Sequence, residues 1–145
     1  MSLVAGLMLL GSATYADDDD KKGTTVVIEF DVLKSMKGDT FELTVSANGK
    51  KKTCTDVSIE LKKKRNKSEK IHFDLDLINI HSIRIKNNSK KPFGWKRITF
   101  KLHSEENGNN KTVSKGAAII KSKTALTIPF TGSFKGAKKS ELKDL

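Results

Sequence analysis

Apolar residues recur at every second position in runs spread from residue 26 to residue 130, and that period constrains the fold more than any other feature. Seven runs alternate apolar with polar side chains, at 26–32, 41–47, 57–61, 71–77, 83–85, 98–102 and 126–130. Strands that alternate in this way bury one face and leave the other in water, which is typical of antiparallel sheets and not of helices.

Turn residues separate these runs. Asn48-Gly49 is the strongest hairpin signal, since both residues accept a positive φ. Looser turns lie at 37–39 and 107–109, and Gly116 precedes an eighth candidate strand at 117–121. This spacing predicts an all-β fold, a single antiparallel β-sandwich of about eight strands over residues 24–130. The 145 residues leave no room for a second large domain, and the Gly-, Lys- and Ser-rich segment 131–145 is expected to be a flexible basic tail.

The first 16 residues have no charged side chain and consist of an apolar run followed by small residues. This pattern predicts a signal peptide cleaved after Ala16, and hence a secreted, extracellular protein. The run is too short for a transmembrane segment, which needs about 20 residues. A short helix packed on the domain and a retained lipid anchor are the alternatives.

An acidic lead segment, residues 17–23, follows the predicted signal peptide. Its four aspartates and a lysine match the site read by enteropeptidase-like proteases. The segment is therefore either processed or simply solvated, and we favour the second interpretation.

The chain is basic, with 28 Lys and Arg against 17 Asp and Glu. The densest basic run lies between two predicted strands, so it is expected to be a loop with its charges in water. Cations within one Debye length of about 8 Å attract anionic lipid head groups, sulfated glycans or nucleic acid. A nuclear-import motif and a solvated turn that blunts a sheet edge are the alternatives. The candidate residues for binding an anionic surface are Lys62, Lys63, Lys64, Arg65, Lys67 and Lys70.

Two aromatic residues stand among lysines in the segment 91–96. Phe93, Trp95 and Lys96 are predicted to lie on a loop tip and to contact a membrane or a partner, because Trp favours the head-group region and Lys favours anionic lipid. The alternative is that Trp95 caps the core while Lys96 covers it. These aromatics are too few for a single-strand nucleic-acid platform, so nucleic acid is not an expected partner.

Three Asn-x-Ser/Thr sequons begin at Asn66, Asn87 and Asn110, and all three fall in predicted loops. Together with a signal peptide, this predicts a glycan on at least one of them in a eukaryotic source.

Residues for catalysis or metal binding are scarce. The single Cys54 excludes an internal disulfide, and it is either a quiet thiol or pairs with another chain, so the oligomeric state stays open. His72 and His103 fall on predicted polar faces and His81 at a turn, without any metal or triad spacing. We therefore expect no enzyme, metal or cofactor. A hydrolase would have to use outward residues such as Asp74 or Asp76.

Residues 69–102 combine a strand of alternating apolar residues, an Ile-x-Ile strand, a polar loop and a strand opened by a tryptophan. These positions are Phe73, Leu75 and Leu77, then Ile83-Arg84-Ile85, Asn87-Asn88, Pro92, Trp95, Ile98 and Phe100. This order resembles the characteristic half of PLAT domains, also called lipoxygenase homology domains. The resemblance implies an eight-stranded sandwich over 24–130 that docks on lipid or protein without chemistry of its own. The acidic cluster of calcium-dependent members is missing, which leaves calcium binding without support.

Together these features predict a secreted, non-catalytic binding domain that docks on anionic membrane surfaces or protein partners through basic loops. The alternative is a secreted effector or toxin-like protein that binds sulfated glycans or host signalling proteins.

Overall fold

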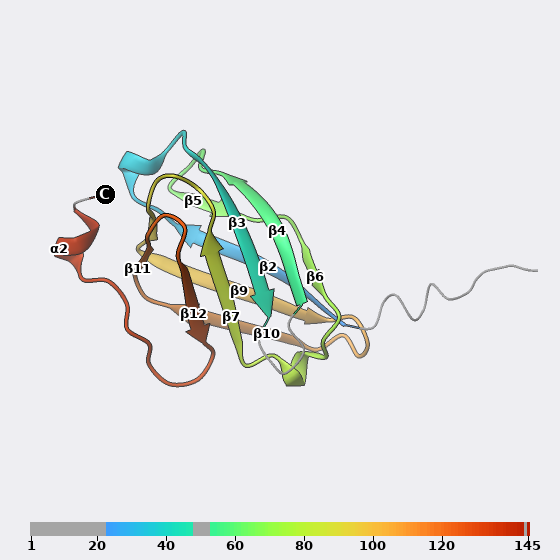
Figure 1. The fold of residues 1–145 in the computed structure, drawn as a ribbon. Helices are drawn as coiled ribbons and strands as arrows, with labels where there is room; N and C mark the ends of the chain where they lie inside the picture. Colours follow the sequence, from blue (N-terminus) through green and yellow to red (C-terminus); the bar gives the residue numbers. More distant parts are fainter. Residues whose placement is uncertain (1–22, 48–52, 144) are drawn as a thin grey trace, which may run out of the picture.

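The computed structural model describes residues 23–47, 53–143 and 145 (Figure 1). The predicted signal peptide and residues 17–22 of the acidic lead segment lie outside the described residues, as do the turn residues 48–52. The described strands are β2 (Thr24–Asp31), β3 (Thr40–Ala47), β4 (Thr53–Glu60), β5 (Arg65–Lys67), β6 (Ile71–Phe73), β7 (Ser82–Asn87), β8 (Phe93–Trp95), β9 (Arg97–Ser104), β10 (Asn110–Lys115), β11 (Ala118–Ile120) and β12 (Ala125–Pro129). The described helices are short: η1 (Lys34–Met36), η2 (Leu77–Asn79) and α2 (Lys139–Leu142).

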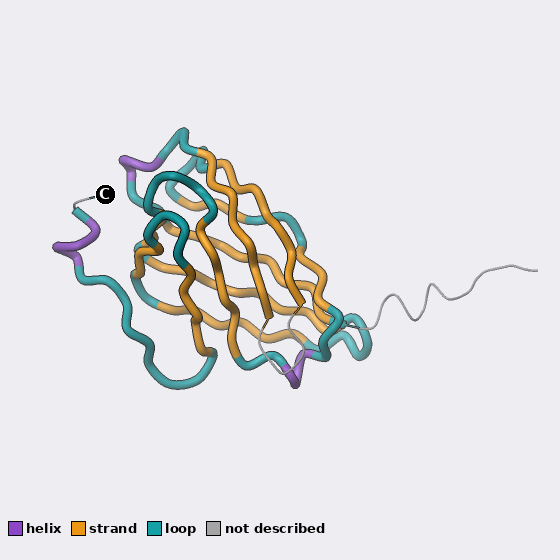
Figure 2. The backbone as a smooth tube through the Cα atoms, in the orientation of Figure 1, coloured by secondary structure: helices purple, strands orange, loops and turns teal. Residues whose placement is uncertain are grey.

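The strands form two antiparallel layers, which confirms the predicted all-β sandwich. The first sheet has the order β10-β9-β2-β5, with β6 also paired to β2, and the second sheet has the order β12-β7-β3-β4. A small third sheet pairs β11 with β8. Strands run between two sets of loops at opposite ends of the molecule (Figure 2).

The register explains the period-two pattern. Along β2 and β9, the pairs Val26↔Leu102, Ile28↔Phe100 and Phe30↔Ile98 all lie in the core. Residues between them on each strand are only partly buried or exposed. The alternation in the sequence therefore marks inward and outward faces of both strands.

The core is richest in aromatic side chains where the small sheet meets the two large ones. Phe93 of β8 packs against Phe30 of the first sheet and Phe41 of the second, with ring centroids 5.1 Å and 4.8 Å apart. Trp95 is fully buried, and its Nε1–H donates to the carbonyl of Gly116 at 3.0 Å. A buried indole requires such a partner for its N–H group.

Some predicted boundaries are wrong. The strand predicted at 71–77 ends at Phe73, since β6 is only three residues long, and Leu77 begins η2. The predicted basic loop contains the strand β5, and β10 was not predicted at all. Both occupy sheet edges, where few side chains face the core: Val113 is the one fully inward residue of β10.

The tail differs from the expectation of a flexible segment. Its backbone is tied to the sandwich where Ala137 N–H donates to Ala117 O at 2.8 Å. Leu142 of α2 is buried, and Phe134 and Leu145 pack against the core cluster. Three apolar residues spaced among lysines are enough to hold this tail against the domain.

Candidate functional site

The lysines of the connecting loops are gathered at one end of the sandwich, which we call the basic end. It is formed by the connections after β2, β4, β7, β8 and β11 and lies at the upper left in Figure 1. All of its lysines are exposed, whereas its connections contain one acidic residue, Asp39. These ten lysines are Lys34, Lys37, Lys62, Lys63, Lys64, Lys90, Lys91, Lys96, Lys121 and Lys123.

Backbone hydrogen bonds join these connections to one another and to the strand ends. Lys64 O accepts from Val32 N at 2.9 Å, which links the connections after β4 and β2. The connection after β11 meets the end of β7 where Lys123 N donates to Asn87 O at 2.8 Å. The lysines therefore occupy one cross-braced surface although they are far apart in the sequence.

The opposite end has the opposite charge among the described residues. Its connections are residues 74–81, between β6 and β7, and residues 105–109, between β9 and β10. They contain Asp74, Asp76, Glu105 and Glu106 and no lysine or arginine. Residues 48–52 lie outside the described residues and do not enter this comparison. The described connections at the two ends therefore carry opposite charges.

Few cations of the basic end are neutralised by carboxylates. Lys34, Lys37, Lys63, Lys64, Lys90, Lys96, Lys121 and Lys123 have no ion pair with any described residue. The ion pairs at this end are Lys91 with Asp39 at 3.4 Å, Lys62 with Glu60 at 3.9 Å and Arg65 with Asp31 at 3.4 Å. Exposed ion pairs of this kind stabilise a protein by at most about 1 kcal/mol each.

The structure divides the predicted anionic-surface residues. Lys62, Lys63 and Lys64 belong to the basic end, but the prediction of one continuous loop is wrong, because Arg65–Lys67 forms β5. Arg65 and Lys67 lie across from Asp31 and Glu29 of β2, so opposite charges stand beside them. Lys70 lies further along the edge, beside the outer face of the first sheet.

Asn66 holds the turn that presents Lys62 to Lys64. Its Oδ1 accepts from the backbone N–H groups of Lys62 and Lys63 at 3.0 Å and 3.2 Å, and its Nδ2 donates to Lys63 O at 2.6 Å. The side chain is buried under this turn. Three neighbouring lysines are therefore carried by a fixed backbone.

The predicted aromatic contact surface is wrong for two of its three residues. Phe93 and Trp95 are 0% exposed because β8 pairs with β11 and turns both rings into the core. The alternative, in which Trp95 belongs to the core, is confirmed. Lys96 is exposed and belongs to the basic end. Among the described residues the exposed large hydrophobic side chain is Ile78, at the opposite end.

The three sequon asparagines have different surroundings, and the prediction that all lie in loops is wrong. Asn87 ends β7, is 0% exposed, and its Nδ2 donates to Lys91 O and Ile120 O at 2.7 Å and 3.0 Å. Asn66 is buried as described above. Asn110 begins β10 and is exposed, with His103 Nδ1 2.7 Å from its Oδ1.

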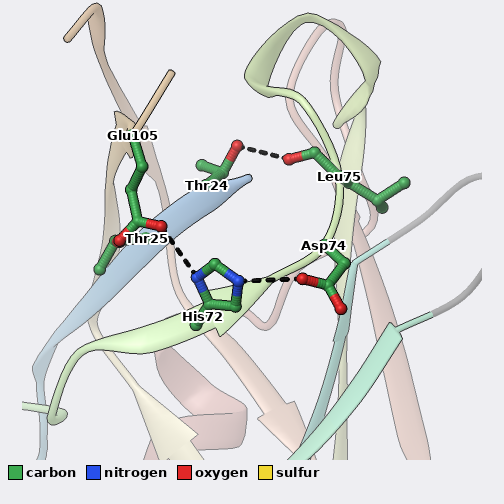
Figure 3. Close-up of polar contacts among 6 residues, drawn as sticks. All are labelled: Thr24, Thr25, His72, Asp74, Leu75 and Glu105. Atoms are coloured by element: carbon green, nitrogen blue, oxygen red, sulfur yellow. Dashed lines mark hydrogen bonds and ion pairs between the residues drawn. The ribbon is translucent and has the colours of Figure 1, made fainter. Parts of the chain in front are cut away.

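A polar cluster at the acidic end was not predicted as a unit (Figure 3). His72 lies between two carboxylates, with Nδ1 3.1 Å from Glu105 Oε1 and Nε2 3.0 Å from Asp74 Oδ1. Thr25 Oγ1 donates to Glu105 Oε2 at 2.7 Å. The hydroxyl proton is held by a carboxylate and not by the imidazole, so His72 is not placed as a base for Thr25. The cluster ties the β6–β7 connection to the β9–β10 connection.

Cys54 and His103 each contact a polar side chain of a neighbouring strand. Cys54 is exposed on β4, with Sγ 3.1 Å from Ser46 Oγ. His72 and His103 are exposed as predicted. Within the described ranges no three His, Cys, Asp or Glu residues are arranged to hold a metal ion.

Comparison with known proteins gives no assignment. No protein-family model matches the chain, and a search of curated proteins returns no match either. In the part of the chain that the structure describes, no helix is long and apolar enough to cross a membrane.

Proposed function

We propose that this chain is a secreted, non-catalytic binding domain that docks its basic end on an anionic membrane surface. The observation that carries the proposal is the gathering of ten exposed lysines on one cross-braced end, whose connections contain one acidic residue, Asp39. The PLAT-like stretch 69–102 supports the same class of function, since such domains dock on lipid or protein.

The attraction is electrostatic and does not depend on insertion. Each lysine near an anionic bilayer contributes about 1 kcal/mol, so several acting together give firm docking. With Phe93 and Trp95 in the core, the described part of the basic end offers no exposed large apolar side chain to insert.

The test is binding to vesicles of phosphatidylserine and phosphatidylcholine, compared with phosphatidylcholine alone, over a salt series. The variant Lys62→Gln, Lys63→Gln, Lys64→Gln removes three charges from the basic end. We expect it to weaken binding by about 2–3 kcal/mol. A matched variant, Lys70→Gln, Lys101→Gln, Lys111→Gln, removes three charges elsewhere and should bind nearly like the parent. Equal binding by both variants would refute the proposal.

A sulfated glycan is the second candidate, because the ten exposed lysines of the basic end can also bind a polyanion. A polyanion needs cations at the surface but no apolar contact. If heparin binds with the same variant pattern while phosphatidylserine vesicles do not bind, the glycan is the partner and the effector-like function is the better assignment.

A further inference from the structure

A groove runs between the C-terminal helix α2 and the basic end. Its volume is about 610 Å³, which lies in the ordinary range for small-molecule sites. Figure 1 shows α2 beside β11 and the β2–β3 connection. The residues that line the groove are Leu33, Lys96, Ala117, Lys139, Leu142 and Lys143.

The tail is anchored on either side of α2, and this keeps the groove in place. Ala137 N–H donates to Ala117 O at 2.8 Å before the helix, and Ser35 Oγ donates to Leu145 O at 3.4 Å after it. Leu142 faces inward and is 6% exposed. The helix is therefore held across the loops as the second wall of the groove.

The lining combines an apolar floor with a cationic rim. Leu33, Ala117 and Leu142 supply the floor, while Lys96, Lys139 and Lys143 supply the rim. None of these lysines has an ion pair with a described residue. Glu141, the acidic residue of α2, does not line the groove, and its Oε1 accepts from Lys138 N at 3.0 Å.

We propose that this groove binds one long-chain fatty acid, with its alkyl chain on the apolar floor and its carboxylate among the rim lysines. One fatty acid satisfies both halves of the lining. Burial of its CH₂ groups provides affinity, and the ammonium groups of the rim lysines select its negative carboxylate. The groove shares Lys96 with the basic end, but membrane docking uses the charges of the loops and no cavity.

Trp95 provides an internal probe of occupancy. It is the single tryptophan of the chain, it precedes Lys96, and its Nε1 donates to Gly116 O beside Ala117. Ligand in the groove should therefore alter the fluorescence of Trp95.

The full chain is titrated with sodium dodecanoate below its micelle concentration, and calorimetry gives the stoichiometry. We expect saturation at one dodecanoate per chain, with dodecyltrimethylammonium, which has the same chain and a positive head, binding at least about tenfold more weakly.

Two matched variants assign the site. Lys96→Gln, Lys139→Gln, Lys143→Gln should weaken dodecanoate binding by about tenfold or more, whereas Lys62→Gln, Lys63→Gln, Lys64→Gln should leave it nearly unchanged. Ala117→Leu, which narrows the floor, should also weaken it while the thermal melt stays cooperative. Three outcomes would each overturn the proposal. Dodecanoate binding does not saturate, dodecyltrimethylammonium binds as tightly as dodecanoate, or the two triple variants lose the same amount of dodecanoate affinity. If the parent protein binds dodecanoate but does not bind anionic vesicles, only the membrane function is refuted.

Discussion

The indole of Trp95 and the carbonyl of Gly116 are joined by a 3.0 Å hydrogen bond that fastens the small sheet to the β10–β11 connection. The ring is 0% exposed and lies 5.8 Å from the rings of both Phe30 and Phe93. Trp95 therefore belongs to the core, although lysines stand near it in the sequence. Lys96, the nearest of these lysines, is exposed on the surface.

Trp95→Ala should lower the free energy of unfolding by about 3–5 kcal/mol, the range for deletion of a buried aromatic ring. Urea unfolding measures this loss. Since the ring cannot reach a bilayer, vesicle binding per folded molecule should match the parent even in high salt. A variant of parental stability that binds vesicles more weakly than the parent in high salt would instead place Trp95 at the membrane.

Phe73→Ala and Asp74→Ala should differ sharply although the residues are adjacent. Phe73 ends β6 with its ring in the core, and its removal should cost about 3–5 kcal/mol. Asp74 is exposed and contacts His72, so its removal should cost less than about 1 kcal/mol. Denaturant melts of the two variants measure both effects, and two equal, small losses would show that the inward face of β6 is misassigned.

The sandwich itself was predictable because its long strands carry their registers in the sequence. Strands β2 and β9 alternate in burial over their full length, and β3 does so from Thr40 to Val45, since one face of each lies in the core. The hairpin at Asn48 is consistent with the antiparallel pairing of Ala47 with Thr53. Strands β5 and β10 were not predictable in this way, because edge strands bury few side chains and are defined by pairing with β2 and β9.

The candidate site was only partly predictable for a related reason. Lys62 to Lys64 are adjacent and form a visible run, whereas Lys34, Lys90 and Lys121 are scattered and unremarkable alone. Strand topology brings them together, since each connection emerges at one of two ends. Summing charge separately for the connections at each end would have revealed this surface. The groove under α2 had no such signal, because the docking of Leu142 depends on tertiary packing.

Asn66→Ala should loosen the lysine turn without unfolding the domain. The substitution removes three hydrogen bonds to the backbone of Lys62 and Lys63 and should cost about 1–3 kcal/mol. The backbone amides of these two residues should exchange with solvent much faster by NMR, while those of β9 should not change. Unaltered exchange at Lys62 and Lys63 would show that another contact fixes the turn.

Glycosylation should distinguish the three sequons by burial. In a eukaryotic secretion system Asn110 is the expected carrier, since it is exposed on β10, while Asn87 is 0% exposed with its Nδ2 committed to two carbonyls. Intact-mass measurement should show a glycan that is lost in Asn110→Gln. Asn87→Gln should leave the glycan mass unchanged and instead destabilise the protein, because Asn87 Oδ1 accepts from Ser89 N and the Nδ2 bonds fix the loop after β7.

A glycan at Asn110 lies near the acidic connections, so its enzymatic removal should leave vesicle binding through the basic end unchanged. Glycan found on Asn87 in folded, secreted protein would contradict the packing described for the end of β7.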